Sequence, residues 1–127
     1  MSFAWVEYLT LAEVLVRQRG TLADAEACCR AAISRAYYAA YCAARNHARD
    51  VEGGAFAQTG DDHRRVLVHY RRAADPLHQE IGEVLFRLRR HRAQADYDDT
   101  LLDAVPRAFA ACRRARRVLT LLQALQG

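Results

Sequence analysis

The chain has 127 residues, half of them hydrophobic, and a formal net charge of +4 at pH 7. This length fits one domain, residues 1–127, that can bury a real hydrophobic core. No apolar run approaches the ~18 residues that a membrane span requires, and the first seven residues hold an acid and no basic stretch, unlike a secretory signal. We therefore expect a cytoplasmic protein without a membrane-spanning segment.

Every basic residue is an arginine, and lysine is absent. Arginine forks onto phosphates and stacks on bases, so the composition suits a nucleic-acid or nucleotide partner. High-GC codon usage also replaces lysine by arginine and is the better explanation for the absence of lysine. Only the positions of the arginines therefore bear on a binding site.

The four cysteines, at positions 28, 29, 42 and 112, show neither a C-x-x-C pair nor a matched histidine spacing. Their places on predicted helices indicate small buried side chains with reduced thiols. We expect no metal site and no cofactor.

The N-terminal part of the chain predicts two helices separated by a short turn. Residues 3–19 form the first, and its inward side comprises Trp5, Tyr8, Leu9, Ala12, Leu15 and Val16. Gly20 marks its end, and Thr21 is the expected N-cap of the next helix, with Asp24 three residues on completing a box-like start. The second helix covers residues 22–49 and contains neither Gly nor Pro.

The rest of the chain predicts three more helices. Residues 53–62 form a glycine-containing polar loop, and residues 62–74 form a short helix. Pro76 then opens a fourth helix, on which Glu83 and Arg87 pair on the solvent side, and whose apolar side comprises Leu77, Ile81, Val84, Leu85 and Leu88. A polar break at 96–100 leads into a last helix over residues 101–124, whose core side includes Val105, Phe109, Cys112, Leu119 and Leu122. The fold class is therefore all-α, a single antiparallel bundle of four long helices plus one short helix.

The second helix has two unlike faces. Small and aromatic residues suited to close packing share one face: Ile33, Tyr37, Ala40, Ala44 and His47. Arginines and a tyrosine share the opposite face, which comprises Arg35, Tyr38, Cys42, Arg45 and Arg49. The second face has two interpretations of equal weight, arginines that extend to water or arginines that line a binding site.

Two segments resemble a known family. Ser34-Arg35-Ala36-Tyr37-Tyr38-Ala39-Ala40-Tyr41, followed by Ala43-Ala44-Arg45, is similar to the central helix of the HEPN domain family of small prokaryotic all-α proteins. The segment 88–97, which ends in Arg92-Ala93-Gln94-Ala95-Asp96-Tyr97, resembles the downstream Leu…Arg-x-x-Ala-Asp-Tyr signature of that family. The resemblance covers roughly residues 4–125 and implies a HEPN-like helical homodimer.

The resemblance also implies where to look for a site. Many HEPN members are metal-independent ribonucleases that use an arginine followed four to six residues later by a histidine, at the cleft of the homodimer. Tyr97 occupies the matching histidine position when counted from Arg92, and Ala95 occupies it when counted from Arg90. Tyrosine is a poor base at pH 7, so we expect little or no RNA cleavage. Matches elsewhere, such as Arg64 to His69, are as frequent as chance predicts.

The residues that matched the family or the second face become the candidates. Catalytic candidates are Arg92, Asp96 and Tyr97, and candidates for binding RNA or a nucleotide are Arg35, Tyr38, Arg45 and Arg90. Tyr97 can donate a hydrogen bond, stack on a base or accept a nucleotidyl group. The third role follows from the resemblance, since partner nucleotidyltransferases silence some HEPN toxins by modifying a tyrosine in this region. Arg92 falls on the apolar side of its helix, where a charge needs a partner. A structural pair with Asp96 is the alternative to a role in binding or catalysis.

The function that the resemblance implies is binding of RNA or a nucleotide by a homodimer. It further implies a toxin–antitoxin or defence component that works with a nucleotidyltransferase partner, with ribonuclease activity left open. The alternative is a non-catalytic adaptor or accessory subunit that contacts a larger effector through its helical surface. We interpret His47 and His91 as structural residues.

Overall fold

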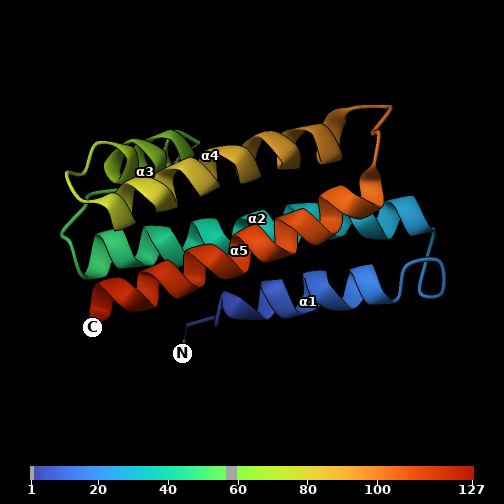
Figure 1. Cartoon of the computed structure of the whole chain (residues 1–127), viewed down its shortest axis with the longest axis horizontal. Coiled ribbons are helices and arrows are strands. Elements are labelled where there is room, and N and C mark those ends of the chain that lie inside the picture. The colour runs from blue at the N-terminus through green and yellow to red at the C-terminus, as the bar shows by residue number, and fades with distance from the viewer. Residues whose placement is uncertain (1, 57–59) are drawn as a thin grey trace.

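The computed structural model describes residues 2–56 and 60–127, which form an all-α bundle (Figure 1). Its helices are α1 (Val6–Arg17), α2 (Ala25–Asp50), α3 (Asp62–Arg71), α4 (Pro76–Tyr97) and α5 (Ala104–Gln126). The predicted fold class is confirmed, and α3 is the short helix. The loop prediction for residues 53–62 falls in part on residues 57–59, which lie outside the described residues.

Helix α2 is the centre of the bundle and packs against all four other helices. Figure 1 shows α1, α2, α4 and α5 running lengthwise and α3 lying beside the first turns of α4, at the end of the bundle where α2 finishes. The predicted packing face of α2 is buried, from Ile33 through Tyr37 to His47. Alanines on this face let the neighbouring helices approach closely, so a helix with few large side chains supplies much of the core.

The start of α2 differs from the prediction. Asp24, not Thr21, is the N-cap, and its carboxylate accepts a hydrogen bond of 3.0 Å from the amide of Ala27. The backbone turns back before that point, because Gly20 adopts a φ of +78° and its amide donates to the carbonyl of Ala23. A carboxylate cap also gains from the positive end of the helix dipole, which a threonine lacks.

The start of α4 agrees with the prediction, and its end shows a contact that the sequence did not indicate. Pro76 lies in the first turn, and the N-cap Asp75 accepts a hydrogen bond of 3.1 Å from the amide of His78. At the other end, the Arg30 guanidinium of α2 donates to the carbonyls of Ala95 and Asp98, at 2.9 and 2.7 Å. These bonds satisfy carbonyls that have no partner within the helix.

Two predicted core residues lie at the surface instead. Leu77 is 36% exposed, and Phe109 is 44% exposed with its ring 5.5 Å from the guanidinium of Arg19. Helix α4 buries Ile81, Leu85 and Leu88 at its centre, so its first turn extends beyond the core. In the described part of the chain, none of the helices has the length and apolar character needed to cross a membrane.

Helices α3 and α4 meet at Gly82. A Cβ atom at this position would lie 2.5 Å from Cγ of Arg71 and 2.9 Å from its backbone nitrogen. Glycine is therefore required by the close approach of the two backbones. Next to it, Glu83 pairs with Arg71 at 3.0 Å and not with Arg87, so the predicted i,i+4 pair is replaced by a contact between helices.

Candidate functional site

The most informative concave feature is a cavity of about 460 Å³ between the start of α1, the middle of α2 and the start of α3. We call it the aromatic–arginine pocket. Aromatic rings, two arginines and a histidine dominate its lining, which comprises Trp5, Tyr8, Arg35, Tyr38, Tyr41, Cys42, Arg45, Asp62 and His63. Three of the predicted binding residues, Arg35, Tyr38 and Arg45, are therefore brought together in one cavity.

Both pocket arginines lie over aromatic rings. The guanidinium carbon of Arg35 is 4.7 Å from the ring centroid of Tyr8 and 5.1 Å from that of Tyr38. The Arg45 guanidinium carbon is 5.7 Å from the ring of Trp5. Within the described residues, neither guanidinium forms an ion pair with a carboxylate; Arg35 donates to the hydroxyl of Ser34 and Arg45 to the amide oxygen of its neighbour Asn46. Their charge is therefore available to an anionic ligand.

His63, at the start of α3, is the pocket residue that the sequence did not reveal. Its ring stacks on Tyr41 with 4.1 Å between centroids and 7° between planes. Its Nδ1 atom lies 2.5 Å from the hydroxyl of Tyr37. Burial lowers the pKa of His63 below its usual value, and the positive charges of Arg89 and Arg92 lower it further. The imidazole is consequently neutral at pH 7.

The neighbouring tyrosines are neutral as well. Burial raises the pKa of Tyr41 to about 12 and raises that of Tyr37 even more. The Tyr37 hydroxyl and His63 Nδ1 thus share one hydrogen bond without a formal charge on either group. A neutral imidazole with one ring nitrogen engaged leaves its Nε2 atom to act on a ligand in the pocket.

Arg92 reaches this group from α4. Its guanidinium carbon lies 5.5 Å from the Tyr37 ring and 5.7 Å from the Tyr38 ring. Its Nη1 atom pairs with Asp96 at 3.4 Å, and the hydroxyl of Ser34 donates to the same carboxylate at 3.4 Å. The predicted Arg92–Asp96 pair is therefore present. The buried Nε–H of Arg92 has no hydrogen-bond partner among the described residues, so the pair does not satisfy the whole guanidinium.

Two predicted site residues lie elsewhere. Tyr97 is 77% exposed at the end of α4, and Arg90 lies near the ring of Phe86 and lines a separate small cavity with His91 and Arg107. Both belong to the same helix as Arg92. About 100° of rotation per residue places Arg90 on the opposite side of the helix from Arg92, and Tyr97 well away from it.

The predicted burial of the cysteines is confirmed. All four are buried and free, and Cys42 forms part of the pocket wall. Burial raises the pKa of the Cys42 thiol and raises that of Cys112 to about 11. Both thiols are therefore protonated at neutral pH and are poor nucleophiles.

Comparison with protein-family models, with curated proteins and with solved structures gives no match. The HEPN resemblance therefore stays a prediction. The interpretation of the pocket depends on its own chemistry.

Proposed function

We propose that the chain is a HEPN-like homodimeric protein that binds RNA or a nucleotide in the aromatic–arginine pocket. The observation that carries the proposal is the position of Arg35 and Arg45, two guanidinium groups held over aromatic rings without a carboxylate partner. Guanidinium groups fork onto phosphate oxygens, and exposed ring faces stack on bases. The cavity volume of about 460 Å³ is typical of a pocket for a small ligand or a single nucleotide unit.

The homodimer and its partner are the less direct part of the proposal. The ring of Phe3 contacts Trp5 with 4.9 Å between centroids and is 49% exposed, so an apolar surface adjoins the pocket. A second copy would bury that surface and complete a shared cleft. Tyr97, exposed at the end of α4, is accessible to a nucleotidyltransferase, as the proposed toxin–antitoxin role requires. Sedimentation that gives a monomer at tens of micromolar protein would rule out the shared cleft.

The binding experiment uses a short, fluorescently labelled single-stranded RNA and fluorescence anisotropy. Arg35→Ala and Arg45→Ala each weaken binding about tenfold or more, because each removes a charge-assisted contact to phosphate. Arg49→Ala is the matched control, since Arg49 belongs to the same helix but pairs with Asp50 at 2.7 Å and lies outside the pocket. Raising the salt from about 50 to 200 mM weakens binding of the wild type strongly and of each pocket variant less, because fewer counterions are released.

Equal losses of RNA affinity in Arg49→Ala and in the pocket variants would contradict the proposed site. No binding even at low salt would contradict RNA recognition altogether and favour the adaptor. A mononucleotide that competes with the RNA would show that one nucleotide unit fills the pocket.

One observation favours RNA cleavage as a second candidate function. His63 supplies, in space, the imidazole that is missing at the position matched along the chain, and its nearest cations are arginines. With its Nδ1–H donated to Tyr37, Nε2 can accept the proton of a ribose 2′-hydroxyl. The 2′-oxygen then attacks phosphorus, the bond to the 5′-oxygen breaks, and that oxygen takes a proton from water. The hydroxide so formed recovers the proton held by Nε2, which leaves a 2′,3′-cyclic phosphate, a 5′-hydroxyl and a neutral His63.

Cleavage is tested with purified protein, RNA and a metal chelator. Activity that is lost in His63→Ala and kept in His91→Ala would establish this second function and overturn the expectation of little cleavage. Activity that survives His63→Ala would exclude His63 as the base.

A further inference from the structure

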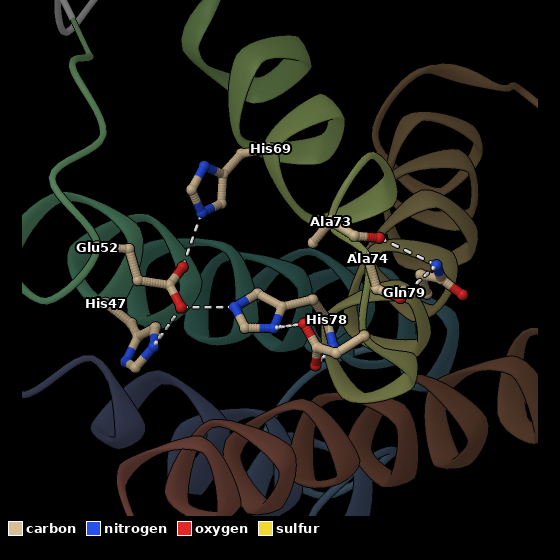
Figure 2. A network of polar contacts seen from close by, with 8 residues as sticks. His47, Glu52, His69, Ala73, Ala74, His78 and Gln79 are labelled. Atoms are coloured by element: carbon tan, nitrogen blue, oxygen red, sulfur yellow. Dashed lines mark hydrogen bonds and ion pairs between the residues drawn. The ribbon is translucent and has the colours of Figure 1, made fainter.

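A second polar site lies at the other end of α3 from the pocket. Figure 2 shows the carboxylate of Glu52 between the rings of His47, His69 and His78. The distances from Glu52 oxygens to the Nε2 atoms of these rings are 3.2, 2.7 and 2.5 Å, in that order. The other nitrogen of His78, Nδ1, lies 2.6 Å from a carboxylate oxygen of Asp75. We call these five residues the histidine–carboxylate cluster.

The cluster joins the ends of three helices. His47 lies in the last turn of α2 and Glu52 follows that helix, while His69 lies in the last turn of α3. Asp75 is the N-cap of α4 and His78 lies in its first turn. The side chain of His47 is 4% exposed and that of His78 is 15% exposed, so water competes weakly for these contacts.

The geometry around His78 determines its protonation. Both of its ring nitrogens face carboxylate oxygens at 2.5 and 2.6 Å. A neutral imidazole carries one N–H, and its other nitrogen would direct a lone pair at an oxygen lone pair, which is repulsive. This geometry therefore favours the imidazolium form of His78, in which both nitrogens carry a proton. Its Nδ1 forms a close ion pair with Asp75 that is not aligned as a hydrogen bond. Burial opposes this charge, but Asp75 and Glu52 outweigh burial and raise the pKa of His78.

His47 and His69 differ from His78 in the number of carboxylates that they contact. His47 and His69 each make one contact to Glu52, through Nε2, which a neutral ring can donate. Burial raises the pKa of Glu52, but hydrogen bonds from His69 and His78 outweigh burial and leave it below its usual value. The cluster thus contains two carboxylates, and His78 is the ring whose two nitrogens both face them.

Among the described residues, the ring of His69 faces His78 with 6.5 Å between centroids, and no arginine pairs with the carboxylates of Glu52 or Asp75. From α3, the ring of Tyr70 stacks on His78 with 5.6 Å between centroids, and its hydroxyl donates to the carbonyl of Ala44. On the next turn of α4, Glu80 is engaged by Arg117 of α5 at 2.7 Å. Loss of the proton from His78 would therefore leave the charges of Glu52 and Asp75 without the cation between them.

Helix α3 connects this cluster to the pocket. It has 10 residues and is about 15 Å long, with His63 in the pocket at one end and His69 in the cluster near the other. A short helix of this kind is held in place mainly by its tertiary contacts. Loss of the contact between His69 and Glu52 is therefore expected to shift α3 and, with it, the position of His63.

We propose that the histidine–carboxylate cluster is a proton-dependent latch that holds α3 against α2 and α4 and keeps His63 in the aromatic–arginine pocket. In the protonated form, His78 bridges Glu52 and Asp75 and closes the latch. Without that proton the two carboxylates separate and α3 loosens. The latch does not depend on what the pocket binds, so it can fail or hold independently of the proposed function.

The pH range follows from the signs of the shifts. The pKa of His78 is raised in the fold, so its contribution to stability is complete below the ordinary value of 6.5 and is lost as the pH rises through the raised value. The pKa values of Glu52 and Asp75 are lowered, so their contribution is lost as the pH falls through those lower values. The latch is therefore closed in mildly acidic solution and opens on the alkaline side.

The test is an NMR titration of the full chain labelled with ¹⁵N at histidine, in the presence of EDTA so that no divalent ion takes part. We expect both nitrogens of His78 to be protonated in more than half of the molecules at pH 6.5, with a midpoint shifted above that value. The stacking contact between His63 and Tyr41 weakens over the same pH range. A His78 midpoint at or below 6.5, or a His63–Tyr41 contact that does not follow His78, would overturn the latch.

A variant pair provides the second measurement. His78→Gln removes the charge, so its melting temperature loses the decline that the wild type shows above pH 6.5. His91→Gln is the control, because His91 is half-buried outside the cluster and arginines and burial lower its pKa. The control keeps the wild-type decline. A decline that persists unchanged in His78→Gln would contradict the proposal, and if that variant does not fold, the wild-type titration still decides.

Discussion

The two ends of α3 place the same residue type in opposite electrostatic surroundings. In the aromatic–arginine pocket, burial and the arginines at 89 and 92 lower the pKa of His63 and keep it neutral. In the histidine–carboxylate cluster, Asp75 and Glu52 raise the pKa of His78 and favour its charged form. Both rings are largely removed from water, so the sign of the neighbouring charges, not burial alone, determines the protonation state.

This difference assigns different tasks to the two regions. Within the described residues, the pocket holds two arginines that form no ion pair, beside neutral rings and the carboxylate of Asp62, and these arginines suit an anionic ligand that arrives from solution. The cluster pairs its charges internally and leaves little for a ligand, which suits a structural and pH-sensitive role. The predictions that follow test this division, beginning with the change that disturbs both regions together.

Gly82→Ala should have the largest effect. The new methyl group would meet the backbone nitrogen of Arg71 at 2.9 Å, so α3 must move away from α4. We expect a loss of about 2–3 kcal/mol in the free energy of unfolding, typical of an overpacked contact, measured by urea denaturation.

Because α3 carries both His63 and His69, Gly82→Ala should also shift the NMR signals of both histidines. Gly60→Ala is the control, since a Cβ atom there meets open space. A Gly82→Ala variant as stable as the control would contradict the close contact between the helices.

Arg92→Ala separates a structural role from a ligand-binding role at the edge of the pocket. Among the described residues, the substitution leaves Asp96 with the weak hydrogen bond from Ser34 alone, and it removes a cation from the rings of Tyr37 and Tyr38. We expect a loss of about 1–2 kcal/mol in stability and a further loss of RNA affinity. A lower melting temperature with unchanged affinity would assign Arg92 to the structural pair alone.

His78→Gln should destabilise the chain by about 1 kcal/mol at pH 6, where the wild-type imidazolium bridges two carboxylates. The difference from the wild type should shrink as the pH rises above 6.5, because the wild type then loses the same charge. Thermal denaturation of both proteins at a series of pH values measures this difference in stability. A difference that grows with pH would reverse the assigned protonation state.

Tyr97→Phe should have the smallest effect, because the side chain is 77% exposed. We expect stability within about 0.5 kcal/mol of the wild type and unchanged RNA affinity. Nucleotidylation by a partner enzyme, followed by mass spectrometry, should disappear in this variant. Modification that persists in Tyr97→Phe would move the acceptor to another tyrosine.

The sequence was sufficient to predict the helices and three residues of the pocket wall. Residues three and four apart share a helix face, so Arg35, Tyr38 and Arg45 could be placed together from spacing alone. Pro76 likewise predicted the start of α4, because its fixed φ suits the first turn of a helix.

The rest of the pocket could not be predicted in this way. His63 comes from a different helix, and only the packing of α3 on α2 and α4 brings its ring onto Tyr41. Trp5 and Tyr8 were predicted as core residues, since periodicity finds the inward side of a helix but not a cavity on that side. The histidine–carboxylate cluster draws on positions 47, 52, 69, 75 and 78, which no local motif connects.

The most direct test of the proposed function is to observe where RNA binds. The histidine NMR signals of the wild type are followed at low salt while a short single-stranded RNA is added. Binding in the aromatic–arginine pocket predicts a saturable shift of His63 with much smaller changes at His91, which lies outside the pocket and lines a separate cavity. Shifts confined to the cluster histidines, or no shift at His63 while the RNA is bound, would contradict it.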